Sequence, residues 1–219
     1  MNETALTSLD ELVRPCIDLI DARHQAREQA VKVSRTLIQQ CARTIRATHR
    51  GTFEQAAQLL AEAGQTAQQL RLAVAAYDDL LAAGYTQDAL KEYVEAAMVY
   101  AFLVGHSPPS AERLQVSPAA FLNGLAEAAS ELRRAILDCL RRDEMSRSES
   151  LLAIMDEIYS LLITVDYPDA LTGGLRRNTD ALRGVLERTR SDVTNALRQN
   201  RLMAALQQTE EHRVKPTTT

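Results

Sequence analysis

The sequence predicts an all-α protein, a bundle of about six to seven antiparallel helices. Apolar residues recur at intervals of three and four along most of the 219 residues, which is the periodicity of amphipathic helices. The chain contains only 8 Gly and 6 Pro, so long stretches run without a helix breaker. It has no Trp, and aromatic residues make up 4%, which argues against a sheet-based fold.

The first helix is expected over about 15–49, because Gly51 supplies a stop signal. Pro15 either opens this helix or kinks it. A second helix is expected over about 52–83, with Gly64 as a weak point inside it.

The third helix is expected to begin at an N-cap on Thr86 and to end near Val104. Ser117 followed by Pro118 combines an N-cap with a first-turn proline, and this pair predicts the start of a fourth helix.

A fifth helix is predicted from Ser146 and Glu149, which have the spacing of a capping box. The last helix is expected over about 171–208 and is loosened at the two glycines 173–174. We expect 1–209 to form a single domain and 210–219 to be a frayed polar tail.

Three cysteines, Cys16, Cys41 and Cys139, lie far apart in apolar stretches, so we expect buried free thiols rather than disulfides or a zinc site. No apolar run approaches the ~20 residues that a membrane span needs, and no segment has the pattern of a signal peptide. These features predict a soluble, cytoplasmic protein without a membrane partner.

A formal net charge of −4 conceals a polarised chain. Residues 21–50 contain seven basic and two acidic groups, whereas residues 51–131 contain three basic and ten acidic groups. On the first helix, a polar and mainly basic stripe steps by three and four residues through Lys32, Arg35, Gln39, Arg43, Arg46 and Arg50. The opposite face of that helix is expected to be buried and consists of Ala30, Val33, Leu37, Cys41, Thr44 and Thr48.

This basic stripe has two interpretations: a solvated cationic face, or a surface that follows the phosphates of a nucleic acid. Because few aromatic residues are interleaved, binding would depend on the backbone and not on base sequence. The candidate nucleic-acid-binding residues are Arg23, Arg27, Lys32, Arg35, Arg43, Arg46 and Arg50.

Two pairs of glutamates have helical spacing, Glu92 with Glu95 and Glu127 with Glu131. If their helices pack antiparallel, four carboxylates converge, which is unfavourable unless some are protonated or a cation binds. An oxygen-only cluster suits Mg²⁺ or Mn²⁺ and the hydrolysis of a phosphodiester. The alternatives are ordinary exposed helix faces and a nucleotide pyrophosphohydrolase, although the chain lacks the paired glutamates of that enzyme class at position 91.

Several segments, in this order, resemble the translin family and within it translin-associated factor X. They are Asp-Ala-Arg-His at 21–24, Val-Lys-Val-Ser-Arg at 31–35, Lys-Glu-Tyr-Val-Glu-Ala at 91–96, Phe-Leu-Asn-Gly-Leu-Ala-Glu at 121–127 and Glu-Leu-Arg at 131–133. The resemblance implies a helical bundle that assembles into a hollow, roughly octameric shell of one subunit type.

The resemblance also implies a metal-dependent endonuclease that cuts single-stranded RNA and binds single-stranded DNA as well. The family's catalytic acids fall on Glu92, Glu95 and Glu127, which with Glu131 as a fourth acid would hold Mg²⁺ or Mn²⁺. Position 127 is Glu where the family's nuclease subunit has Asp. A non-catalytic nucleic-acid-binding shell and a purely structural scaffold remain the other hypotheses.

Overall fold

The computed structural model describes residues 9–214, and this part of the chain contains nine α-helices and no strand. The prediction of an all-α bundle is therefore confirmed. Six helices are long: α1 (Leu9–His49), α2 (Phe53–Val74), α4 (Gly84–Val104), α6 (Pro118–Leu140), α7 (Met145–Leu162) and α9 (Leu175–Val214). Three others have four residues each: α3 (Asp78–Leu81), α5 (Ala111–Leu114) and α8 (Asp169–Thr172).

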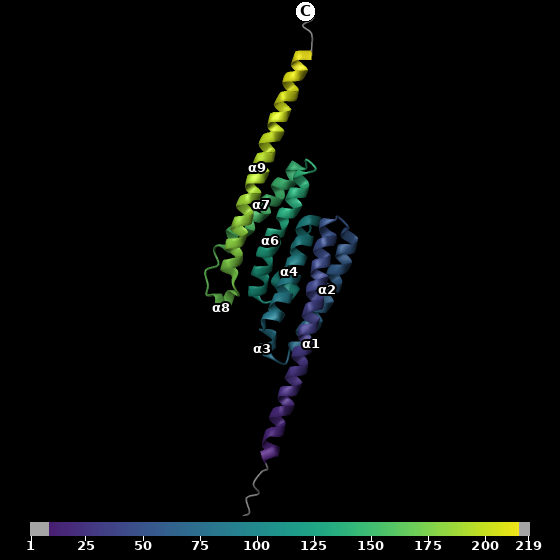
Figure 1. The fold of residues 1–219 in the computed structure, drawn as a ribbon, viewed down its shortest axis with the longest axis vertical. Helices are drawn as coiled ribbons and strands as arrows, with labels where there is room; N and C mark the ends of the chain where they lie inside the picture. The colour runs from purple at the N-terminus through teal and green to yellow at the C-terminus, as the bar shows by residue number, and fades with distance from the viewer. Residues whose placement is uncertain (1–8, 215–219) are drawn as a thin grey trace, which may run out of the picture.

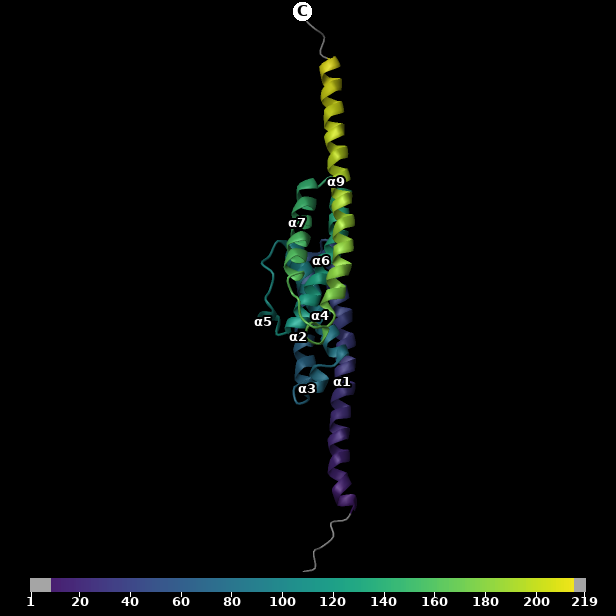
Figure 2. The ribbon, with the colours of Figure 1, turned by 90° about the vertical axis from the view of Figure 1, so that its left-hand side faces the viewer.

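Helices α1, α4, α6 and α9 run in one direction, while α2 and α7 run in the opposite direction (Figures 1 and 2). The register of side-chain contacts agrees with this arrangement: Asn178 meets Asn123 near the start of α6, and Thr189 meets Arg133 further along both helices. Helices α4 and α6 run parallel, so the antiparallel packing that was the condition for four converging carboxylates does not occur.

The segment 105–117 explains the parallel pairing of α4 and α6. Gly105 ends α4 in the left-handed conformation (φ 84°), which glycine adopts without a steric penalty. The chain then returns along the outside of the bundle, through α5, to the end at which α4 began (Figure 2). As a result, the first halves of α4 and α6 lie side by side, and this places their glutamates at the same level.

The buried face of α1 is the one that the sequence predicts, since all six expected residues are buried. They pack in a core shared with α2 and α4, while a second core joins α4, α6, α7 and α9. The basic stripe lies on the opposite, exposed side of α1.

The ends of the helices differ from expectation at several places. Helix α1 begins at Leu9 and contains Pro15 inside it, where the proline lies in the second turn of an exposed stretch. Helix α2 ends at Val74, well before the expected end at 83. Thr86 is not an N-cap, because α4 begins at Gly84 and the Thr86 hydroxyl donates instead to Leu80 O at 2.8 Å.

The predicted N-cap at Ser117 is confirmed, since its hydroxyl oxygen accepts a hydrogen bond from Ala120 N at 3.1 Å. Ser146 is not a cap, because α7 begins one residue earlier, after Glu144. The chain does break at 173–174, where both glycines have positive φ.

Helix α9 continues to Val214, past the expected end of the domain at 209. The last part of the predicted polar tail, 215–219, lies outside the described residues.

The two terminal helices extend beyond the body of the bundle at opposite ends (Figure 1). Both extensions carry exposed large apolar side chains. These are Leu9, Leu12, Val13, Ile17, Leu19 and Ile20 on α1, and Leu202, Met203 and Leu206 on α9. Over residues 9–214, no helix combines the length and hydropathy needed to cross a membrane.

Candidate metal centre

A close contact between α4 and α6 sets the geometry of the site. A Cβ atom added to Gly124 on α6 would lie 2.6 Å from Lys91 O and 2.7 Å from Val94 Cβ, closer than real atoms approach. Only glycine therefore permits this approach of the two helices. Glu127 follows Gly124 by three residues, about one turn, so the contact brings its side chain next to α4.

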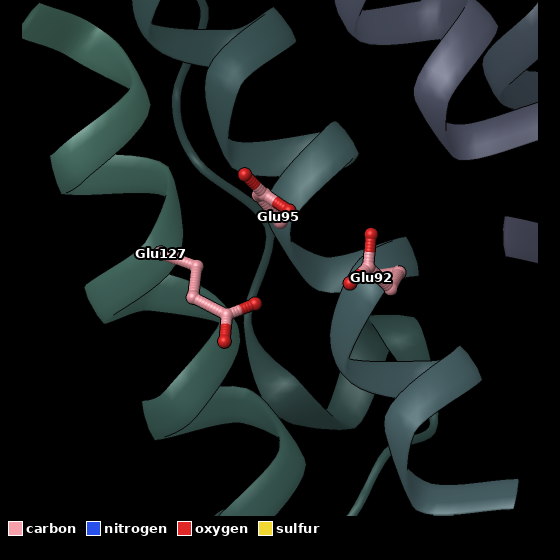
Figure 3. A group of neighbouring side chains, drawn as sticks. All are labelled: Glu92, Glu95 and Glu127. Carbon is pink, nitrogen blue, oxygen red and sulfur yellow. The ribbon is translucent and has the colours of Figure 1, made fainter. Parts of the chain in front are cut away.

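Three of the four predicted acids meet at this contact. Glu92 and Glu95 project from α4, and Glu127 projects from α6 toward them (Figure 3). One carboxylate oxygen from each residue lies within 4.8 Å of the other two, and all three side chains are half-buried. We call Glu92, Glu95 and Glu127 the carboxylate cluster.

The carboxylate cluster is electrostatically unfavourable without a cation. Burial raises the pKa of Glu95 to about 8, and the charges of Glu92, Glu127 and Glu131 act in the same direction. Burial also raises the pKa of Glu92, with Lys91 opposing this effect and Glu127 adding to it.

Lys91 supplies a positive charge within this group. Its Nζ donates a hydrogen bond to Glu127 Oε1 at 2.7 Å and lies 4.0 Å from Glu92 Oε1. Burial alone would lower the pKa of Lys91, but Glu127, through its hydrogen bond and charge, and Glu92 raise it overall. The ammonium group is therefore charged and competes for oxygens that a divalent ion would use.

Glu127 also contacts Asn178, which in turn is held by Asn123. Asn178 Nδ2 on α9 donates to Asn123 Oδ1 at 2.9 Å and lies 3.4 Å from Glu127 Oε1. Asn123 is buried, and its Nδ2 donates to Thr172 O at 2.7 Å, which ties the network to α8. Neither asparagine can be recognised from the sequence, because 55 residues separate them and neither belongs to a motif.

Glu131 does not join the carboxylate cluster, which corrects its expected place as a fourth ligand. It lies one turn further along α6, where its Oε1 is 2.8 Å from His49 Nε2 and 4.0 Å from Arg134 Nη1. The His49 ring is almost fully buried, and its Nε2 is at ion-pair distance from Glu131 without hydrogen-bond geometry. Glu131 thus acts on Glu95 through its charge rather than as a neighbouring oxygen donor.

The donor set of the carboxylate cluster fits a hard divalent cation. Three half-buried carboxylates offer only oxygen, and Mg²⁺ and Mn²⁺ prefer oxygen ligands. Binding of two positive charges would relieve the repulsion that raises the pKa of Glu95.

A cleft of about 590 Å³ opens beside the carboxylate cluster and is shared by α4, α6, α8 and α9. Lys91 and Glu127 form part of its wall, and the exposed Arg177 stands across from them on α9. The cleft gives an extended, charged molecule room to approach Glu127.

Helix α1 contacts α4 through its buried face, which includes Cys41. Burial raises the pKa of the Cys41 thiol, and the charges of Glu92 and Glu95 raise it further. On α1 and directly after it, five cations are exposed and have no ion-pair partner among residues 9–214: Lys32, Arg35, Arg43, Arg46 and Arg50.

The other two candidate nucleic-acid-binding residues form ion pairs within the chain. Arg23 forms an ion pair with Asp79 of α3, and Arg27 Nη1 lies 2.6 Å from Glu28 Oε1. These pairs leave the stretch of α1 from Lys32 onward as its uncompensated basic surface.

The chain is similar to solved structures whose names contain C3PO. It is 34% identical to AfC3PO in a structure of a complex with duplex RNA. The superposition has a TM-score of 0.75 and covers 84% of this chain and 95% of that one. A crystal structure of AfC3PO alone gives the same identity and a TM-score of 0.74, covering 84% and 96% of the two chains. Apo-NeC3PO, 18% identical, shares the fold with a TM-score of 0.77 over 87% of this chain and 99% of its own.

Among curated proteins, an uncharacterized protein of Methanocaldococcus jannaschii is 27% identical over 199 residues, which cover 90% of this chain and 87% of that protein. No family model matches the sequence.

Proposed function

This chain belongs to the translin-like C3PO family, and from that premise we propose that it is an endoribonuclease that depends on a divalent cation. Within the family we assign it to the catalytic type, similar to translin-associated factor X. The observation that carries the proposal is the carboxylate cluster: three acids from two helices meet in a half-buried site and offer only oxygen ligands.

Glu92, Glu95 and Glu127 would hold Mg²⁺ or Mn²⁺. When bound, such an ion stabilises negative charge on a phosphodiester and activates water for in-line attack. Asn178 Nδ2 donates a hydrogen bond to Glu127 Oε1, which helps to orient that carboxylate. Burial and the neighbouring carboxylates raise the pKa of Glu95 to about 8, so binding of the ion would have to displace its proton. The resulting carboxylate would then be able to accept a proton from the attacking water.

The proposed substrate is single-stranded RNA, with single-stranded DNA as a second ligand. AfC3PO has been solved with duplex RNA, which supports RNA as the class of partner. In this chain the five unpaired cations of α1 are suited to phosphates, because arginine offers forked donors and each contact releases counterions.

We further propose that the chain assembles with copies of itself into a hollow, roughly octameric shell. The apolar side chains on the projecting ends of α1 and α9 support this, since exposed apolar patches of this kind mark interfaces. Cys41 and Cys139 are buried free thiols as expected, whereas Cys16 is exposed, which corrects that expectation. Free thiols are typical of a reducing compartment, and we propose a cytoplasmic location.

The experiment that tests the activity is incubation of the purified protein with labelled single-stranded RNA, with Mn²⁺ or with a chelator. We expect cleavage only with the metal, and products with 5′-phosphate and 3′-hydroxyl ends, because water is the nucleophile. Products with 2′,3′-cyclic phosphate would show attack by the RNA's own hydroxyl and would contradict the proposed chemistry.

One observation favours a second candidate, a non-catalytic RNA-binding shell. The ion pair of Lys91 with Glu127 partly neutralises the carboxylate cluster without any metal. In that case RNA binding would be sensitive to salt, and RNA would stay intact at every Mn²⁺ concentration.

A further inference from the structure

A second polar groove lies among α2, α4 and α5, on the side of α4 that faces away from the carboxylate cluster. Tyr93 lines this groove and comes two residues before Glu95, so the two side chains point about 160° apart around the helix. The groove has a volume of about 510 Å³. Its lining includes Arg71 and Arg113 but neither Asp nor Glu among the described residues, although the chain as a whole is acidic.

Arg71 is half-buried in the groove without a carboxylate partner. Its Nη2 donates to Gln115 Oε1 at 2.9 Å and its Nη1 to Leu114 O at 3.4 Å, and both acceptors are neutral. Burial lowers the pKa of Arg71, as expected for a guanidinium removed from water without a counterion. A guanidinium has five N–H donors, so these two bonds leave capacity for a further acceptor.

Tyr93 and Arg113 complete the group. The Tyr93 hydroxyl packs against α2, since a Cβ atom on Gly64 would lie 3.0 Å from it. Arg71 and Arg113 line the same groove as Tyr93. Arg113 is exposed and forms no ion pair within residues 9–214.

We propose that this groove binds a phosphoryl group between Arg71 and Arg113, with the Tyr93 hydroxyl as a third donor. Two guanidinium forks and a phenol match the several oxygens of a phosphate, and a dianion supplies the charge that Arg71 lacks. The site is independent of the proposed nuclease activity, because it shares no side chain with the carboxylate cluster. The phosphate could belong to a small molecule or to the backbone of a nucleic acid.

The test is calorimetric titration of the full chain with pyrophosphate, in the absence of divalent metal. We expect saturable binding by the wild type and about tenfold weaker binding by Arg113→Gln, because a charge-assisted contact is lost. Arg71→Gln should weaken binding similarly, but Arg71 also tethers α5, so Arg113→Gln is the decisive variant. Arg198→Gln, an exposed arginine on α9, is the matched control and should bind as the wild type does.

Competition identifies the source of the phosphate. If a short single-stranded RNA without terminal phosphates displaces pyrophosphate, the groove takes the nucleic-acid backbone; if only phosphate monoesters and pyrophosphate compete, it takes small molecules. Both results support the site. Absence of binding by the wild type, or equal affinity of the wild type and Arg113→Gln, would overturn it.

Discussion

The ammonium nitrogen of Lys91 lies 2.7 Å from Glu127 Oε1, inside the group of carboxylates that we propose as a metal centre. The chain therefore has its own cation at the point where α4 and α6 come closest. A divalent ion that binds to Glu127 must compete with this lysine, and the competition has measurable consequences.

Replacement of Lys91 by methionine should strengthen the binding of Mn²⁺. The change removes a competing positive charge from Glu127, and an affinity increase of about tenfold corresponds to a net gain of one charge-assisted contact. Calorimetric titration with Mn²⁺ measures this directly. In chelator, the same variant should be less stable than the wild type, because the carboxylates then repel one another without compensation. Unchanged Mn²⁺ affinity would mean that the lysine and the ion do not share Glu127.

Glu95→Gln should reduce RNA cleavage by at least about a hundredfold, since the change removes both a metal ligand and a proton acceptor. RNA binding should change little, because the cations of α1 remain. Glu157→Gln, which removes an exposed carboxylate on α7, is the matched control and should cleave as the wild type does. Full activity in Glu95→Gln would exclude that residue from the site.

Stability in chelator should fall as pH rises from about 4.5 to about 8. An unfolded glutamate titrates near 4.5, whereas Glu95 in the folded protein has a pKa of about 8. Between these values the folded state keeps a proton that the unfolded state has lost, so the free energy of unfolding decreases with pH. The destabilisation is absent below pH 4.5 and complete above about pH 8.

Urea denaturation of wild type and Glu95→Gln at pH 5 and pH 8 tests this dependence. Glutamine does not titrate. The free energy of unfolding of the variant, relative to that of the wild type, should therefore increase by about 2 to 4 kcal/mol from pH 5 to pH 8. For Glu157→Gln, the free energy of unfolding relative to the wild type should be the same at both pH values. A constant difference between Glu95→Gln and the wild type at both pH values would refute the strong perturbation of Glu95.

Gly124→Ala should destabilise the protein by roughly 1 to 3 kcal/mol, because the new methyl group would collide with the backbone of α4. Gly184→Ala is the matched control. It also lies inside a long helix, but its nearest neighbour is the flexible end of Arg188 at 3.4 Å, so helix propensity should stabilise that variant by about 0.5 to 1 kcal/mol. Thermal unfolding compares the two variants, and equal melting temperatures would show that the contact of α4 with α6 is not tight.

Arg46→Ala should weaken RNA binding and make it less dependent on salt. Each phosphate contact that is lost should reduce the slope of log affinity against log salt by about one. Arg141→Ala, which removes an exposed arginine that is paired with Asp138, should leave the slope as it is. If both variants have the same slope, α1 is not the surface that the RNA follows.

The sequence was sufficient to predict the helical class and the two faces of α1, because period and charge are local properties. The buried residues from Ala30 to Thr48 and the exposed cations opposite them follow directly from the three-and-four spacing. Ser117 was recognised as a cap for the same reason, since a cap depends only on the next few residues.

The sequence could not give the direction in which α6 runs relative to α4. That direction depends on the segment 105–117, which returns the chain to the same end of the bundle. Thr86 has the sequence pattern of an N-cap, but it lies inside α4, and its hydroxyl donates to Leu80 O, which precedes that helix. Likewise, Glu127 and Glu131 have equivalent spacing in the sequence, and only the packing at Gly124 selects the first of them for the carboxylate cluster.

The most direct measurement of the central claim is the anomalous scattering of Mn²⁺ in crystals of the protein. We predict a single strong peak bounded by the carboxylate oxygens of Glu92, Glu95 and Glu127, with Lys91 Nζ moved away from Glu127. A peak elsewhere, or no peak while Lys91 still contacts Glu127, would contradict the assignment of these three acids as the metal centre.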